Sequence, residues 1–294
     1  MQRTERDTFL RNRKRFIKKM SIAETTPATK LILVIVANTN DAEIGKGCRQ
    51  DIKSIRHMFK KLCKHMDFDC LELLVMGHNY SKKNVLDAIS ILKPDDNDIV
   101  VFYYSGHGFS YKKDKGKRFP QLDLRPASAS NKIKVLNENT HNLAELFEAV
   151  KSKGARLNIV IGDCCNNTIK FKRVAQKQDA DFSIKKKPRM SINKIMGEAL
   201  FCNYTASIIV AAADKGQFAV SDDKLGSIFT HNFANNFKIL LKRPTNNEEG
   251  MPWQRLLQET KEETFEMSRK YEIENGKQGN QKAIFEIQFD KSAY

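Results

Sequence analysis

The sequence predicts an α/β protein with a central, mostly parallel six-stranded sheet and helices on both faces. Short apolar runs rich in Val and Ile alternate with segments in which apolar residues recur every three or four positions. This alternation of strands and helices is typical of a parallel sheet whose strands are joined by helical crossovers. The chain has 294 residues and is 40% hydrophobic, which is enough to bury the core of one large domain.

Each predicted strand is a short apolar run bounded by turn-forming residues. The first, residues 30–38, is continuously apolar and β-branched, so we expect it to be buried on both faces. The other five predicted strands are residues 69–77, 98–106, 155–163, 207–213 and 282–289.

Five helices are predicted between these strands. Residues 49–66 form an amphipathic pattern, with apolar side chains at Ile52, Ile55, Met58, Phe59 and Leu62. Ser81 is a suitable N-cap for a helix at 81–93, and Gly154 is a suitable terminator for a helix at 142–154. The last two predicted helices are residues 227–242 and residues 252–273, the second with Pro252 near its start.

The pattern is interrupted once, by a segment that predicts a linker. Residues 168–194 have no hydrophobic period and carry many charges, and loops of this length are usually functional or disordered. We therefore predict a basic N-terminal extension at 1–29 and one domain at 30–290. Within the domain, residues 30–166 form the first part, residues 167–200 the basic linker and residues 201–290 the second part.

The net charge of +16 is concentrated in two short segments. Residues 1–30 carry nine Lys or Arg against three Asp or Glu, and residues 168–194 carry nine against two. A nucleic-acid binder with charged tails and a protein with two solvated, flexible segments both fit this distribution. We favour the second interpretation, because aromatic residues are not interleaved with the basic ones as a stacking platform requires.

The cysteine pattern predicts reduced thiols, and the hydropathy predicts a soluble protein. The six cysteines form no CxxC pair, and no neighbouring His spacing indicates a zinc site. The longest apolar runs are far shorter than the ~20 residues that a membrane span needs. The first twenty residues lack the apolar core of a secretory signal. We expect a cytoplasmic protein without membrane association or bound metal, with a secreted form as the alternative if the chain starts elsewhere.

Two neighbouring predicted strands end in residues that together can catalyse acyl transfer. His107 lies between two glycines just after strand 98–106, and Cys164 and Cys165 follow strand 155–163. A Cys and a His are sufficient for acyl transfer, because the His accepts the thiol proton and returns it to the leaving amine. Alone, such a His is more often structural and such a Cys is more often a packing residue. The combination favours catalysis, and Cys165 follows His107 by 58 positions, close to the ~50 known for caspases.

The segments "VVFYYSGHG" and "IVIGDCC" resemble the caspase-like cysteine peptidases, and among them the metacaspases, over about residues 31–289. The resemblance implies a caspase–hemoglobinase-like sandwich, with large-subunit-like and small-subunit-like parts on either side of the linker. It implies that His107 is the general base and acid and that Cys165, rather than Cys164, is the nucleophile. The oxyanion hole would consist of the backbone N–H groups of Gly108 and Cys165.

The same resemblance implies protein or peptide substrates with Arg or Lys at P1, the residue before the cleaved bond. A desolvated cationic side chain must be paired with carboxylates. The residues that match the family's P1 pocket are Cys48, Asp51, Ser105 and Asp163. The alternative is that both acids are helix-cap or surface residues, which would suit Asp51 near a helix start. Asp214 and Gln217 are further candidate substrate contacts.

The basic linker offers many bonds to a peptidase with this preference, and in the family the corresponding segment often contains processing sites. We give equal weight to two hypotheses, that the linker is a site of self-cleavage and that it is a passive basic loop. The candidate cleavage residues are Lys170, Lys172, Arg173, Lys185, Lys186, Lys187 and Arg189.

Two features depart from the family pattern. Asn166 and Asn167 follow the nucleophile where the family usually has His and Ser, which supports a catalytically weak or inactive scaffold or binding module as the alternative function. The region that holds Ca²⁺ in many metacaspases has only Asp123 and Glu138 as acids, although Ca²⁺ needs 6–8 oxygen ligands. We therefore expect no cofactor and no Ca²⁺ dependence. The resemblance suggests a monomer.

Overall fold

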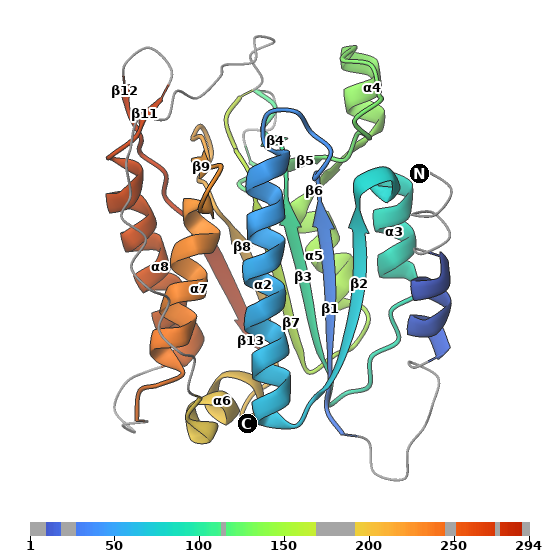
Figure 1. The fold of residues 1–294 in the computed structure, drawn as a ribbon, viewed down its shortest axis with the longest axis vertical. Helices are drawn as coiled ribbons and strands as arrows, with labels where there is room; N and C mark the ends of the chain where they lie inside the picture. Colours follow the sequence, from blue (N-terminus) through green and yellow to red (C-terminus); the bar gives the residue numbers. More distant parts are fainter. Residues whose placement is uncertain are drawn as a thin grey trace.

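The computed structural model describes residues 10–18, 28–112, 116–168, 192–244, 251–273 and 277–289. The candidate self-cleavage residues of the linker lie outside these ranges. Within them the chain forms one central sheet with helices on both of its faces, as Figure 1 shows.

The sheet has six strands in the order β13-β8-β7-β3-β1-β2. All neighbours are parallel except the edge strand β13, which is antiparallel to β8. The predicted α/β class with a mostly parallel six-stranded sheet is confirmed. The strands are β1 (Lys30–Ala37), β2 (Asp69–Met76), β3 (Ile99–Ser105), β7 (Leu157–Asp163), β8 (Ala206–Ala211) and β13 (Ile284–Phe289).

One face of the sheet is covered by the helices α2 (Gly45–Met66), α6 (Lys194–Phe201), α7 (Ile228–Leu240) and α8 (Pro252–Ser268). Their apolar side chains and alternate residues of the strands form the larger core cluster. The opposite face carries α3 (Lys82–Ser90) and α5 (Leu143–Lys151), which bury the smaller cluster. Side chains alternate between the faces of a strand, so each central strand contributes to both cores.

The predicted helix boundaries are partly confirmed. Ser81 is the N-cap of α3, and its side chain accepts a hydrogen bond from the N–H of Asn84 at 3.3 Å. Gly154 follows α5 with a φ of 84°, a conformation that favours glycine. Helix α2 begins at Gly45, four residues before the predicted start, and α8 ends at Ser268, five residues before the predicted end.

Several small elements were not predicted. Most of them have two or three residues, too few to show a period, and one is a helix of only six residues. Between β3 and β7 they are β4 (Gly108–Phe109), β5 (Gln121–Asp123), α4 (Ile133–Glu138) and β6 (Thr140–Asn142), and the three strands form a separate antiparallel sheet. Helix α6 begins inside the predicted linker, so regular structure resumes earlier than expected. The other short elements are η1 (Gly77–Asn79), β9 (Ser221–Asp222), β10 (Gly226–Ser227), β11 (Glu272–Ile273) and β12 (Lys277–Gln278).

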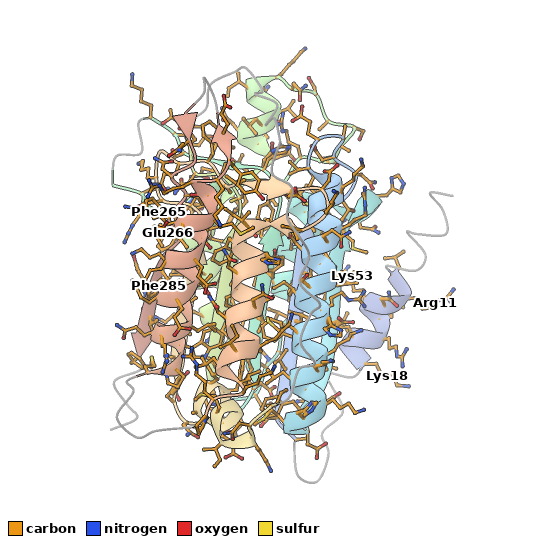
Figure 2. All side chains as sticks on the ribbon, turned by 60° about the vertical axis from the view of Figure 1, so that its left-hand side comes forward. Arg11, Lys18, Lys53, Phe265, Glu266 and Phe285 are labelled. Carbon is orange, nitrogen blue, oxygen red and sulfur yellow. The ribbon has the colours of Figure 1, made fainter. Side chains whose placement is uncertain are left out.

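Part of the basic N-terminal extension packs on the domain. Residues 10–18 are helical, and Phe16 is only 3% exposed because it joins the smaller core cluster. The exposed basic side chains Arg11 and Lys18 lie on this helix (Figure 2). Among the helices in the described ranges, none combines the length and the apolar character needed to cross a bilayer.

Candidate active site

The register of the parallel strands brings the predicted catalytic residues to one edge of the sheet. Ser105, the last residue of β3, pairs with Asp163, the last residue of β7. His107 and Cys165 each follow two positions later. They therefore lie beyond adjacent carboxyl ends, the usual place for a site in an open parallel sheet. These ends point to the top of Figure 1.

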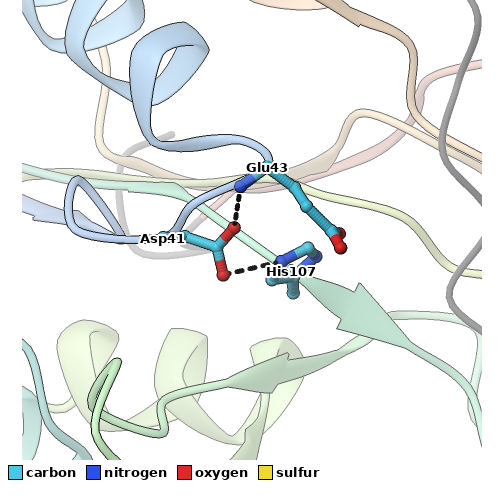
Figure 3. Close-up of side chains that lie close together, drawn as sticks. All are labelled: Asp41, Glu43 and His107. Carbon is cyan, nitrogen blue, oxygen red and sulfur yellow. Dashed lines mark hydrogen bonds and ion pairs between the residues drawn. The ribbon is translucent and has the colours of Figure 1, made fainter.

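His107 is held by a carboxylate that the sequence interpretation missed. Its Nε2 lies 3.1 Å from Oδ2 of Asp41, in the loop between β1 and α2 (Figure 3). Oδ1 of Asp41 accepts hydrogen bonds from the N–H groups of Glu43 at 2.9 Å and Ile44 at 3.1 Å. Burial alone would raise the pKa of Asp41, but the His107 contact and these two N–H groups outweigh it and lower that pKa well below its usual range.

The two adjacent thiols have different environments. Cys164 is 2% exposed and belongs to the smaller core cluster, as expected for a packing residue. The Cys165 side chain is partly exposed, and its Sγ accepts a hydrogen bond from the N–H of Ala219 at 3.2 Å. Burial raises the pKa of the Cys165 thiol to about 11, although the Ala219 N–H opposes this shift. The raised pKa favours the neutral thiol of Cys165 over its thiolate near pH 7.

Gly108 allows the backbone after His107 to approach the backbone of the cysteines. A Cβ at this position would lie 2.6 Å from the carbonyl oxygen of Cys165 and 2.8 Å from Cβ of Cys164, closer than real Cβ atoms come. Because Gly108 has no side chain, its backbone can contact the segment of Cys165, and these are the two predicted oxyanion-hole residues.

The four predicted P1-pocket residues are brought together on the α2 side of the sheet. Ser105 Oγ donates to Oδ2 of Asp51 at 2.8 Å, and the Cys48 thiol lies 3.5 Å from the Ser105 carbonyl oxygen. Cys48 and Asp51 share a face because they are three positions apart on α2. Ser105 and Asp163 point to the same side because they are paired in register.

Asp51 and Asp163 are joined by residues at the start of α7. The N–H of Ser227 donates to Asp51 at 2.8 Å, and its hydroxyl donates to Asp163 at 2.8 Å. Thr230 also donates to Asp163, at 2.5 Å. Ser227 and Thr230 were not predicted, although "GSIFT" contains a helix N-cap pattern that could have indicated Ser227.

Both carboxyl groups are almost fully enclosed, with Asp51 2% and Asp163 3% exposed. Burial raises the pKa of Asp163 to about 6. Burial and the neighbouring charge of Asp163 raise the pKa of Asp51 well above its usual range. Two interacting carboxyl groups of this kind favour sharing one proton and one negative charge near neutral pH.

The asparagines that follow Cys165 hold the loop in place. Asn166 is fully buried, and its Nδ2 donates to the carbonyl oxygens of Arg118 at 2.8 Å and Ala213 at 3.3 Å. Its backbone bonds to Gln217 and Gly216. The carbonyl of Asn167 accepts from the N–H of Ser110 at 2.9 Å.

The candidate contacts Asp214 and Gln217 lie in the loop after β8 and bond mainly to the loop itself. Gln217 Oε1 accepts from the N–H of Asp214 at 3.3 Å and from the N–H of Lys282 at 2.8 Å. Asp214 Oδ1 lies 3.6 Å from Nε of Arg118. The Gln217 side chain therefore connects this loop to the segment just before β13.

Potential metal ligands gather in one place within the described ranges. One ligand atom each from Asp41, Glu43 and His107 lie within 4.8 Å of one another (Figure 3). The acids considered for Ca²⁺ do not form such a group. Asp123 is paired with Arg125 at 2.6 Å, and Glu138 is exposed on α4.

Comparisons with known proteins agree with this architecture. A family model described as "Caspase domain" matches residues 29–287. The chain is also similar to the crystal structure of the protein GSU0716 from Geobacter sulfurreducens, with 13% sequence identity and a TM-score of 0.51, over 90% of this chain and 95% of that one. At this identity the structural likeness shows the fold alone. No curated protein matches the sequence. Because the family model spans most of its length, the chain belongs to the caspase domain family of cysteine peptidases.

Proposed function

We propose that the protein is a cysteine endopeptidase that cleaves peptide bonds after Arg or Lys. The observation that carries this proposal is the enclosed pair Asp51 and Asp163 beside the predicted nucleophile. Within the described ranges, neither carboxylate forms an ion pair with a Lys, Arg or His side chain. In the part of the chain that the structure describes, their hydrogen-bond donors are neutral: Ser105 and Ser227 donate to Asp51, and Ser227, Thr230 and Tyr103 donate to Asp163.

The charge of this pair suits one cationic side chain. An isolated buried carboxylate is unfavourable, whereas a guanidinium or ammonium paired with it forms a strong charge-assisted contact. Because the raised pKa values favour one shared negative charge, one Arg or Lys side chain would neutralise the pocket. An acidic P1 residue would add repulsion and is expected to be rejected.

In the proposed reaction, His107 takes the proton of the Cys165 thiol as Sγ bonds to the scissile carbonyl carbon. The N–H groups of Gly108 and Cys165 donate to the oxygen that becomes negative. The C–N bond then breaks, and His107 returns the proton to the leaving amine. Water, deprotonated by His107, attacks the thioester and releases the carboxylic acid and the thiol.

Peptides that differ only at P1 test the specificity. We expect hydrolysis after Arg and Lys and little after Asp or Leu. Asp163→Asn and Asp51→Asn should raise KM for the Arg peptide by at least about tenfold, the cost of one unpaired charge contact. The control is Asp87→Asn, an acid on α3 that pairs with Lys83. Equal cleavage after Leu and Arg, or unchanged KM in both pocket variants, would overturn the proposed specificity.

The scaffold alternative predicts a different result from the same peptides. A folded wild-type protein that binds the Arg peptide but does not hydrolyse it would support a binding module. Its support in the sequence is the Asn166-Asn167 pair, but Asn166 serves as a loop anchor.

The proposed specificity extends to self-cleavage in the basic linker, whose candidate residues lie outside the described ranges. Thr168, just before them, bridges to Ser110 beside the site. Incubation of wild type and Cys165→Ala, followed by mapping of new termini, tests the idea. New termini after Lys or Arg in wild type alone would support self-cleavage. An intact linker in active enzyme, or equal cutting in both proteins, would contradict it.

A further inference from the structure

We propose that Asp41 is the positioning residue for His107, so that the site operates as a Cys–His–Asp arrangement rather than as a Cys–His pair. This inference rests on the proposed peptidase function. Its first support is the 3.1 Å contact between Oδ2 of Asp41 and Nε2 of His107.

The contact assigns different tasks to the two ring nitrogens. A carboxylate oxygen only accepts, so Nε2 must carry the hydrogen in this contact. In the neutral ring, Nδ1 is then the acceptor. Asp41 therefore selects the tautomer in which Nδ1 is the atom that takes the Cys165 proton. A ring without this partner would populate both tautomers and rotate more freely.

Asp41 is itself held in one orientation. Its Oδ1 accepts from the N–H groups of Glu43 and Ile44, which leaves Oδ2 directed at His107. Its backbone carbonyl accepts from the N–H of Gly45, the first residue of α2, at 3.1 Å. The Asp41 side chain is 12% exposed and the His107 side chain 32%, so solvent screens their contact only in part.

The carboxylate also has a task during the reaction. When the Cys165 proton moves to Nδ1, the ring becomes a cation with hydrogen on both nitrogens. The negative charge of Asp41 opposes that positive charge directly, while Asp41 remains ionised throughout. When His107 gives the proton to the leaving amine, the ring becomes neutral again and Nδ1 is once more an acceptor. No additional reactant is needed.

Glu43 provides a matched control. It lies in the same loop, carries the same charge and places a carboxylate oxygen within 4.8 Å of the His107 and Asp41 ligand atoms. It is exposed, and its contact with Asp41 is made by its backbone N–H, which a side-chain substitution preserves. Glu43→Gln thus removes a nearby charge without removing the contact of Asp41 with His107.

The kinetic test compares Asp41→Asn, Asp41→Glu and Glu43→Gln on the Arg peptide. We expect Asp41→Asn to lower kcat by roughly 10²–10⁴-fold with KM within about threefold, because a wrong tautomer impairs proton transfer more than binding. Asp41→Glu should recover part of kcat, and Glu43→Gln should lower kcat by less than about tenfold, because it removes a charge near His107 but not the contact that selects the tautomer. A kcat for Asp41→Asn equal to wild type, or an equal loss in Glu43→Gln, would overturn the proposal.

A second readout does not depend on activity. In protein labelled with ¹⁵N-histidine, with the His107 signals assigned from a His107→Gln variant, wild type should show a protonated Nε2 and an unprotonated Nδ1. Asp41→Asn should show a mixed or reversed tautomer. A His107 protonated at Nδ1 in wild type would overturn the inference even if peptides are cleaved. If the expected tautomer is observed but none of the peptides is cleaved, the result would support the positioning role and contradict the proposed peptidase function.

Discussion

Ser105 and Asp163 are direct neighbours in the parallel register of β3 and β7. This pairing has two consequences for the site. Their side chains lie on the side of the sheet that α2 and α7 cover, where Ser105 bonds to Asp51 and Asp163 bonds to Ser227. The residues two positions later, His107 and Cys165, reach the same edge of the sheet. One strand pairing therefore supplies the basis for both the proposed specificity and the proposed chemistry.

Replacing Gly108 by Ala should strongly reduce peptide hydrolysis. The added Cβ would lie 2.6 Å from the Cys165 carbonyl oxygen, so the backbone around the proposed oxyanion hole must move. We expect kcat/KM for the Arg peptide to fall at least about 100-fold, the cost of one lost oxyanion donor. Gly116→Ala is the control, because a Cβ there meets nothing within 4 Å. Similar activity in both variants would contradict the assignment of Gly108.

The buried carboxyl pair should leave a signature in the pH dependence of stability. The pKa of Asp163 is raised from 3.8 to about 6 on folding, so the folded protein binds this proton more tightly than the unfolded chain does. The associated stability is fully present below about pH 4 and is lost as the pH rises through 6.

The Asp163→Asn variant lacks this titrating carboxyl group, so it does not lose this stability as the pH rises. The unfolding free energy of the variant relative to wild type should therefore rise between pH 4 and pH 7.5, by up to about 3 kcal/mol at roughly 1.4 kcal/mol per pKa unit. Urea titrations at several pH values, with Asp87→Asn as control, measure this difference. A relative stability that is flat or falls with pH would be incompatible with a raised Asp163 pKa.

Asn166 should contribute more to stability than its neighbour Asn167. Asn166→Ala leaves the carbonyl oxygens of Arg118 and Ala213 without their side-chain donor in a fully buried place. The expected cost is roughly 1–3 kcal/mol of unfolding free energy. Asn167→Ala loses one local contact, with the N–H of Thr168, and should stay within about 0.5 kcal/mol. Equal effects in urea unfolding would argue against the anchoring role.

The resting thiol should react slowly with iodoacetamide at neutral pH. Since the pKa of Cys165 is raised to about 11, the thiolate fraction and the alkylation rate should rise about tenfold per pH unit between pH 7 and pH 9. Mass spectrometry of the modified peptide distinguishes Cys165 from the buried Cys164. A rate that is already constant below pH 8 would instead indicate a preformed thiolate–imidazolium pair.

The sequence was sufficient for the features that depend on pattern and spacing. The six strands have clear apolar runs, and the positions of His107 and Cys165 follow from the ends of two such runs. Cys48 and Asp51 were grouped by the resemblance to the family's P1 pocket, and the structure shows that helical spacing places both on one face of α2.

The contacts that complete the site depend on long-range packing. Asp41 and His107 are 66 positions apart, and Asp163 and Thr230 are 67 apart. No local pattern predicts that the loop after β1 turns its carboxylate toward His107, or that the start of α7 reaches Asp51 and Asp163. The small sheet of β4, β5 and β6 was missed for a different reason, since its strands are shorter than one detectable period.

The most direct test of the account compares wild type, Cys165→Ala and Cys164→Ala on one fluorogenic peptide with Arg at P1, after circular dichroism has shown that all three are folded. We expect hydrolysis by wild type, a loss of at least about 1,000-fold in kcat/KM for Cys165→Ala and retained hydrolysis by Cys164→Ala. Hydrolysis that survives Cys165→Ala, or that disappears only in a folded Cys164→Ala, would contradict it.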